Sequence, residues 1–313
     1  MSLHEYRENL SAARSRGTSA LYAAAWRTFE RAAADAAVSP LPAPAEFVAE
    51  YLSGIGAVRT PSTLRVHAAA IAARHRDLGM QSPTEASCVR RALAGHAHRK
   101  TRDQGQAAPI DASAFERITE TAMHPRRTRG GRTESALEAE HRALVDVCLI
   151  GTMRDAMLRR SEAAALTWAD FALTEDGSGT VRIRRSKTDQ ASEGTVRYVS
   201  PEVVECLDAM RTLHRPDDAD RIFALSPSQI CRRIASAAVA AGLVGAFSGH
   251  SPRVGMAVDL ARAGFGMPMI LEAGRWRSER TAMRYVEGVV ANRGAVAQWY
   301  ARREDADAPT CVQ

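Results

Sequence analysis

A stretch without apolar periodicity, residues 99–110 (RKTRDQGQAAPI), interrupts an otherwise helical pattern and limits how this chain can fold. Its basic and polar residues offer no face that could pack into a core, which is typical of a linker. The chain has 313 residues, long enough for two domains of the common size of ~100–200 residues. We therefore expect one domain over residues 1–105 and a second over residues 111–313.

The first domain is expected to be a bundle of four or five helices. Residues 18–38 are rich in alanine and place Trp26 and Phe29 at roughly helical spacing. The prolines that follow, from Pro40 to Pro44, break this helix. Further helices are predicted over residues 45–54, 60–79 and 83–97.

The second domain is predicted to be rich in helices, with one small sheet. Residues 179–186 and 195–200 alternate in the manner of strands, and a polar turn, KTDQASEG, separates them. Helices are predicted over residues 111–123, 134–154, 159–166, 201–213, 227–241, 252–263, 267–274, 278–289 and 292–303. The fold class is therefore mainly α: a helical bundle followed by an α-rich α+β domain with a small antiparallel sheet.

The basic residues are almost all arginine. Of 42 Lys and Arg residues only Lys100 and Lys187 are lysines. An ammonium group can be tuned to give up its proton, whereas a guanidinium stays protonated at any working pH. Each lysine is therefore a candidate for proton transfer. The formal net charge of +6 fits a nucleic-acid partner but does not require one.

The remaining composition favours a cytosolic protein that does not enter a membrane. The five cysteines are scattered and include no closely spaced pair, which predicts reduced thiols and no cysteine metal site. No run approaches the ~18 uncharged apolar residues that a membrane span needs. The early acidic residues Glu5 and Glu8 argue against a secretory signal.

One long run, GHSPRVGMAVDLARAGFGMPMILEAGRWRSERTAMRY, combines residues suited to a single reaction. His250 and Arg253 lie one helical turn apart, and Trp276 and Tyr285 follow in the same run. A second arginine, Arg159, stands far upstream in the sequence RRSE. The pattern is long and its order is fixed, which makes it a specific signal.

These residue types match the needs of a phenol that attacks a DNA phosphodiester. Negative charge grows on the non-bridging oxygens, and arginine forks at Arg159 and Arg253 can bind them bidentately. An imidazole at His250 can donate to a phosphate oxygen or accept the phenolic proton. Tyr285 would be the nucleophile, and Lys187 would protonate the departing 5′ oxygen.

Each of these residues also has an ordinary interpretation when it is taken alone. An isolated arginine belongs by default to the surface, Trp276 to a core, and Tyr285 to a half-buried position. These separate interpretations do not explain the whole pattern, because residue type, order and spacing all match the same reaction. Glu162 is interpreted mainly as the support of the helix that presents Arg159, although it could also buttress His250.

The chain resembles the tyrosine recombinases of the phage integrase family and, within them, is similar to the Cre-like branch. The similarity lies in RxSE followed by ALTWAD, in RRSKT, in GHSPRVG, in AGxW and in MRY. It implies a catalytic set made of Arg159, Glu162, Lys187, His250, Arg253, Trp276 and Tyr285. The RxSE register favours Arg159 over the adjacent Arg160.

The resemblance also implies an architecture and partners. The N-terminal domain would be a SAM-like core-binding domain, and both domains would grip a duplex whose recombination site is an inverted repeat. Four protomers would assemble at a synapse, with the C-terminal helix of each docked on its neighbour through Val296, Trp299 and Tyr300. No metal or high-energy cofactor is implied, and the protein would act in the bacterial cytoplasm at the nucleoid.

Recognition of the DNA sequence is assigned to the predicted helix over residues 227–241. In Cre-like proteins the corresponding helix lies in the major groove, which implies that four side chains here point at base edges: Ser228, Gln229, Arg232 and Arg233. A bidentate guanine contact is predicted for Arg232, while a phosphate contact or a solvated arginine remains open. The arginine-rich loop 124–132 is likewise open between a solvated surface loop and a phosphate contact.

The expected function is a site-specific recombinase that cuts and rejoins duplex DNA through a 3′-phosphotyrosine. One alternative is a type IB topoisomerase or telomere resolvase, with similar catalysis but no exchange of partners. The helix after Tyr285 argues against it. The other is a non-enzymatic DNA-binding protein on a decayed recombinase scaffold, which the complete set of catalytic residue types argues against.

Overall fold

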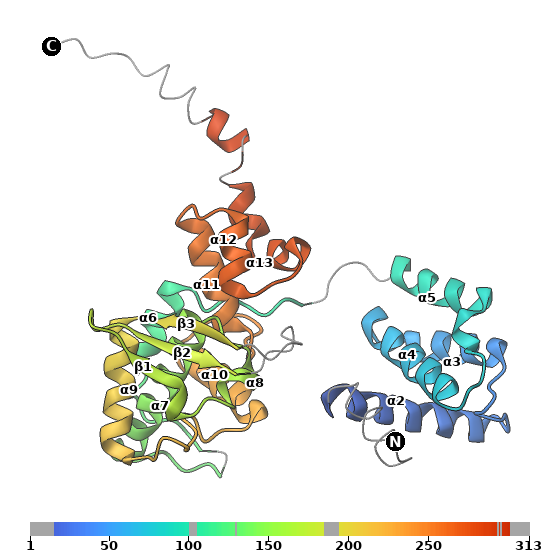
Figure 1. Cartoon of the computed structure of the whole chain (residues 1–313), viewed down its shortest axis with the longest axis horizontal. Helices are drawn as coiled ribbons and strands as arrows, with labels where there is room; N and C mark the ends of the chain where they lie inside the picture. The colour runs from blue at the N-terminus through green and yellow to red at the C-terminus, as the bar shows by residue number, and fades with distance from the viewer. Residues whose placement is uncertain are drawn as a thin grey trace. The chain divides into compact units, whose positions relative to one another are not determined.

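The computed structural model of the protein describes residues 16–99, 105–128, 130–184, 194–292, 294 and 296–300. The chain divides into two compact units, residues 1–104 and residues 105–313. Figure 1 draws the first unit in blue to cyan and the second in green to red. Lys187, the predicted proton donor, lies outside the described residues.

The N-terminal unit is a bundle of helices with its own core. Its elements are α2 (Arg16–Asp35), α3 (Ala45–Gly56), α4 (Pro61–Asp77), the short 3-10 helix η1 (Pro83–Glu85) and α5 (Ser87–Arg99). Helix α4 begins where the sequence predicts, because the Thr60 side chain accepts a hydrogen bond from Thr63 N and a proline opens the first turn. Phe29, Leu52 and Ile71 are fully buried at the centre of the bundle.

The C-terminal unit contains a three-stranded antiparallel sheet among helices (Figure 1). The strands β1 (Phe171–Leu173), β2 (Gly179–Ile183) and β3 (Thr195–Val199) lie in that order, and Val181 pairs with Phe171 on one side and Arg197 on the other. The helices are α6 (Ala112–Glu120), α7 (Ala136–Asp155), α8 (Arg160–Ala163), the 3-10 helix η2 (Trp168–Asp170), α9 (Pro201–His214), α10 (Pro227–Ala240), α11 (Ser251–Arg262), α12 (Met267–Gly274) and α13 (Glu279–Ala291). The predicted fold class, mainly α with a small antiparallel sheet, is confirmed.

The sheet differs from its prediction in detail. Strands β2 and β3 are shorter than the stretches 179–186 and 195–200 that alternate in the sequence. Strand β1 has only three residues, too few for a pattern of period two to reveal it. It forms because its backbone pairs with β2, which is a tertiary contact.

Two apolar cores hold the C-terminal unit together. The larger one surrounds α7 and includes Leu149, Ile150 and Phe223. The smaller one joins Met157, at the end of α7, to α11, α12 and α13, with Ile270 and Val286 buried. Figure 1 shows these three helices gathered at one end of the unit.

Helix α11 approaches the chain before α6 so closely that it needs a glycine. A Cβ at Gly255 would overlap the backbone carbonyl of Ile110. The backbone N of Ile110 donates to the Ser251 carbonyl at 3.0 Å, which keeps the two segments together. The start of α11, where His250 and Arg253 lie, is therefore fixed to the body of the unit.

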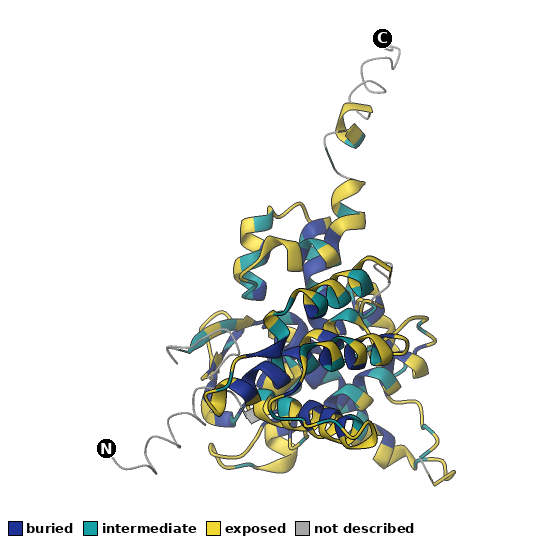
Figure 2. Cartoon of the chain, turned by 90° about the vertical axis from the view of Figure 1, so that its right-hand side faces the viewer, coloured by how far each residue is buried: buried dark blue, intermediate teal, exposed yellow. Residues whose placement is uncertain are grey.

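The helices bury one face and expose the other, as the dark blue and yellow stretches along the helices in Figure 2 show. In α10, Ile230 and Ile234 are fully buried, while Ser228 and Arg232 are exposed. This division follows the spacing of apolar residues in the sequence.

The expectation of five reduced cysteines is wrong for one pair. Cys148 of α7 and Cys206 of α9 form a disulfide, with Cα atoms 5.6 Å apart and 58 residues between them in the sequence. That Cα separation lies within the range that a disulfide can bridge. Spacing along the chain could not reveal the pair, because only the packing of α7 on α9 brings the two cysteines together.

Every described helix is too short or too polar to cross a lipid bilayer. In the same part of the chain, no group of three or more His, Cys, Asp or Glu side chains lies in a position to hold a metal ion.

Candidate active site

The first part of the site is the turn between α7 and α8. Met157 adopts the left-handed conformation, φ 45°, and ends α7 with its carbonyl free to accept side-chain donors. Arg159 is the N-cap of α8, and Glu162 follows in the first turn. The Glu162 carboxylate accepts hydrogen bonds from Arg159 N and from Arg159 Nη1, both at 2.8 Å. The carboxylate thus fixes both the backbone and the side chain of Arg159.

The second part is the start of α11. His250 is the N-cap, and Arg253 lies one turn into the helix. Arg253 is only 2% exposed. Its Nη1 donates to the Met157 carbonyl at 2.8 Å and its Nη2 to the Gly274 carbonyl. Arg253 has no carboxylate partner among these contacts, so its charge is held by backbone dipoles.

The third part is the loop from α12 to α13. Trp276 covers Arg253, whose Cζ lies 4.6 Å from the ring centroid, a cation–π geometry. A Cβ at Gly274 would overlap the Trp276 ring, so glycine is required there. Tyr285, on α13, lies beside Trp276, with ring centroids 5.9 Å apart. One tryptophan therefore links the buried arginine to the tyrosine.

The site carries more positive than negative charge. Burial, together with the charges of Arg159 and Arg275, lowers the pKa of Arg253 to about 9, which still leaves it protonated at pH 7. Burial alone would raise the pKa of Glu162, but hydrogen bonds and charge from Arg275 and Arg159 outweigh it, and the pKa is lowered. One carboxylate therefore faces three guanidinium groups, a surplus that suits an anion.

His250 differs from a typical exposed histidine. Loss of hydration lowers the pKa of its ring, and the charges of Arg253, Arg160 and Arg159 lower the pKa further. The ring is therefore mostly neutral at pH 7, the form that can accept a proton.

The structure thus brings together six of the seven predicted catalytic residues, namely Arg159, Glu162, His250, Arg253, Trp276 and Tyr285. Contacts or charges that act between them link all six. The seventh, Lys187, lies outside the described residues. Arg275, which forms an ion pair with Glu162 at 2.7 Å, was not predicted from sequence patterns. It is one arginine among many, and only its tertiary contacts distinguish it.

The predicted DNA-reading residues of α10 fall into two groups. Ser228, Gln229 and Arg232 are exposed, although Gln229 also caps the helix by accepting from Ser226 N at 2.8 Å. Arg233 instead binds buried Asp146 through Nε at 2.6 Å. The base contact of Arg233 stays a prediction, and in this structure its guanidinium holds α10 against α7.

The arginine-rich loop 124–132 is also tied to the protein. Arg126 Nη1 binds Asp146 at 3.0 Å, and its side chain is only 12% exposed. Arg132 binds Glu138 at 2.7 Å. Neither of the two alternatives, a solvated loop or a phosphate contact, describes Arg126, because it is buried against a carboxylate.

The chain is similar to known proteins both in sequence and in fold. The sequence is 25% identical over 285 residues to the Cre recombinase of Escherichia phage P1, and the match covers 82% of this chain and 80% of that protein. The fold is similar to that of a lambda integrase dimer bound to a core site, with a TM-score of 0.59 at 15% identity, covering 91% of this chain and 77% of that one. It is also similar to the Tn1549 transposon integrase in complex with transposon right-end DNA, with a TM-score of 0.59 at 14% identity, covering 90% and 93%.

The match to a family is more direct. Residues 131–290, half of the chain, match the phage integrase family. The matched region includes every residue of the predicted catalytic set, from Arg159 to Tyr285. The chain therefore belongs to the phage integrase family, whose members are tyrosine recombinases.

Proposed function

We propose that this protein is a site-specific DNA recombinase of the Cre-like branch, which cuts and rejoins duplex DNA through a 3′-phosphotyrosyl intermediate. The observation that carries the proposal is the linked set of Arg159, Arg253, Trp276 and Tyr285. Both arginines are held by internal hydrogen bonds. Groups that are fixed in advance stabilise a transition state without reorganising.

The reaction balances without an external energy source. Tyr285 Oη would attack the phosphorus, so that an O–P bond forms to the tyrosine while the bond to the 5′ oxygen breaks. His250 would take the phenolic proton, because its lowered pKa leaves the ring neutral and able to accept one, and Lys187 would give a proton to the 5′ oxygen. Reversal of these steps with a new 5′ hydroxyl rejoins the strand, since the phosphotyrosyl bond stores the energy of the cut.

The two arginines would bind the charged phosphate oxygens. Arg159 is 16% exposed at its side chain and is the more accessible of the two. Arg253 is nearly buried, so its charge is less screened by solvent and acts strongly over a short distance. Glu162 would hold Arg159 in place, and Trp276 would hold the plane of Arg253.

The DNA partner is expected to be a duplex with an inverted-repeat site. The exposed N-terminal half of α10 would enter the major groove, with Arg232 as the candidate for base contact and Ser228 and Gln229 beside it. The N-terminal domain, with the 99–110 linker, would grip the same duplex. The protein would act on nucleoid DNA in the bacterial cytoplasm.

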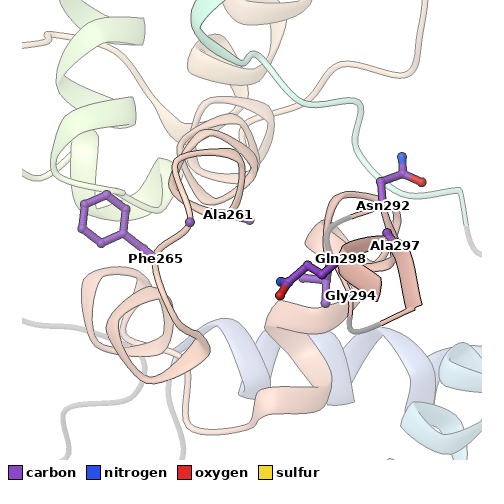
Figure 3. Close-up of a pocket in the computed structure, with 8 residues that line it drawn as sticks. Ala261, Phe265, Asn292, Gly294, Ala297 and Gln298 are labelled. Carbon is purple, nitrogen blue, oxygen red and sulfur yellow. The ribbon is translucent and has the colours of Figure 1, made fainter. Parts of the chain in front are cut away.

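We also propose that protomers associate through their C-terminal segments in a tetrameric synapse. Val296, Trp299 and Tyr300 are exposed. Near them a pocket lies between the end of α11 and the segment after α13, and Figure 3 shows Ala261 and Phe265 on one side and Asn292, Gly294, Ala297 and Gln298 on the other. A neighbouring protomer's apolar segment would fit such a surface.

The test is covalent trapping on DNA. The protein would be incubated with a library of inverted-repeat duplexes, and DNA that remains attached after denaturation would be sequenced. We expect recovered fragments that share one repeat, and recombined products when two such sites are supplied. Relaxation of supercoiled DNA without exchange would indicate the topoisomerase-like alternative instead.

The matched control is Tyr285→Phe. This variant lacks the attacking oxygen, so it should bind the recovered site as tightly as the wild type and trap no DNA. Covalent attachment by the Phe variant would assign the nucleophile to another tyrosine, such as Tyr198 or Tyr300. Binding without any attachment by the wild-type protein would support a decayed scaffold and contradict the proposal.

A further inference from the structure

Arg275 has an unusual backbone for its residue type. It follows α12 with φ 51° and ψ 44°, the left-handed conformation, which glycine adopts readily and side-chain-bearing residues adopt at a cost. Its side chain is nevertheless only 8% exposed. Met157, the other left-handed residue at the site, accepts a hydrogen bond from Arg275. Such backbone strain tends to persist where the surroundings fix it, often at functional sites.

The Arg275 guanidinium joins two hydrogen-bond systems. Nη2 donates to Glu162 Oε2 at 2.7 Å and to the Met157 carbonyl at 3.2 Å. The same carboxylate holds Arg159, and the same carbonyl accepts from Arg253. Arg159 Nη2 also reaches the Arg275 carbonyl at 3.5 Å. Arg275 therefore contacts the acceptors that orient both arginines of the proposed phosphate clamp.

From these contacts we propose that Arg275 is a positioning residue for this clamp. It fixes Glu162 and the Met157 carbonyl. Through these two acceptors it sets the orientation of the Arg159 and Arg253 guanidinium groups. The inference rests on the proposed recombinase function and adds a residue to it. An arginine suits this place because one planar group can serve a carboxylate and a carbonyl at once.

A direct contact between Arg275 and the phosphate is less consistent with the structure. The Nε and Nη1 atoms of Arg275 are buried and have no hydrogen-bond partner within the described residues. Buried nitrogens do not face a surface that could admit a DNA phosphate. Nη2 is already occupied by Glu162 and Met157. The guanidinium therefore acts through its neighbours.

The first experiment measures cleavage in a single turnover. It uses saturating protein and a nicked suicide duplex that carries the half-site recovered by trapping. Arg275→Gly should fold, since glycine favours this conformation, and should bind the duplex as the wild type does. Its cleavage rate should fall about 100-fold, because small displacements of clamping groups can cost that much. Arg275→Lys keeps one donor for Glu162 and should recover part of the rate.

Arg215→Gly is the matched control. Arg215 is also left-handed, with φ 45°, but it ends α9 and is exposed. Its replacement should leave cleavage unchanged. An Arg275→Gly variant that cleaves as fast as Arg215→Gly would overturn the inference. Cleavage by the wild type tests the proposed function separately, so the two failures are distinguishable.

A double-mutant cycle tests whether Arg275 acts through Glu162. We expect Glu162→Gln to slow cleavage, and Arg275→Gly to add little in that background, because interactions within one network are not additive. Two independent effects that multiply would contradict the positioning role.

Discussion

Two clusters of arginines in the C-terminal unit use the same residue type for different purposes. Around Glu162, two arginines (Arg159 and Arg275) share one carboxylate, and a third, Arg253, is held by backbone carbonyls. Around Asp146, three others (Arg126, Arg142 and Arg233) meet that carboxylate, and Arg142 also binds Glu134 at 2.9 Å. The first cluster keeps a surplus of positive charge beside a tyrosine, whereas the second is closer to neutral and ties α10 to α7.

The comparison shows that the acceptors decide what a buried arginine can do. A cluster whose positive charges are largely matched by carboxylates has lost most of its attraction for another anion. An arginine held by carbonyl dipoles and an aromatic ring keeps its charge available. We therefore assign catalysis to the Glu162 cluster and structure to the Asp146 cluster, and the following predictions test that division from the largest expected effect to the smallest.

Lys187→Arg asks whether positive charge alone is enough at position 187. The substitution keeps the charge but supplies a group that does not release its proton, so cleavage should slow by about 10²–10⁴-fold, the range for general acid catalysis. The measurement is single-turnover cleavage. A substrate with a 5′-phosphorothiolate leaving group needs no proton and should restore the rate. Failure of that rescue would remove Lys187 from the role of acid.

Asp146→Asn should break the structural cluster and leave the chemistry intact. The Asp146 side chain is 1% exposed, and its loss leaves three arginines without their shared partner, which costs about 3–5 kcal/mol when a buried pair is broken. Urea unfolding would measure this loss of stability. Cleavage by the folded protein on saturating DNA should change little. A large loss of cleavage with unchanged stability would reverse our assignment of the two clusters.

Arg253→Lys should have the opposite effect to Asp146→Asn: it should slow cleavage and change stability little. Lysine keeps the charge but lacks the planar fork that spans two acceptors, so cleavage should slow by about 10²–10³-fold, as when one preorganised donor is removed. The unfolding midpoint in urea should move less than that of Asp146→Asn. The assignment would be wrong if stability fell sharply while the cleavage rate of the remaining folded protein stayed normal.

Arg232→Ala tests an arginine that belongs to neither cluster. If exposed Arg232 contacts a guanine, its loss should cost about 1–3 kcal/mol and relax preference at one base pair. Binding to a set of singly substituted half-sites measures this. A phosphate contact would weaken binding to all sites equally and reduce its salt dependence. The base-reading role would then be abandoned for this residue.

Much of the fold was predictable from local patterns. The helices from α2 to α13 follow the apolar spacing and the prolines of the sequence. A helix that buries one face has apolar residues at helical spacing along that face, so its own sequence reveals it. The prediction of the catalytic set rests on a different kind of signal. Its chemistry limits the residue types strictly, and the order of His250, Arg253, Trp276 and Tyr285 is fixed along the chain.

The sequence alone therefore determined which helices form and which residue types could perform the chemistry. It could not determine which distant residues contact one another, because such contacts depend on three-dimensional packing. Arg233 was predicted to read bases, and only the tertiary structure shows that Asp146, 87 positions away, binds it. The same holds for β1, for the Cys148–Cys206 disulfide and for Arg275, whose contacts with Glu162 and Met157 span more than 100 residues. Such contacts carry no local periodicity, so only the tertiary structure decided them.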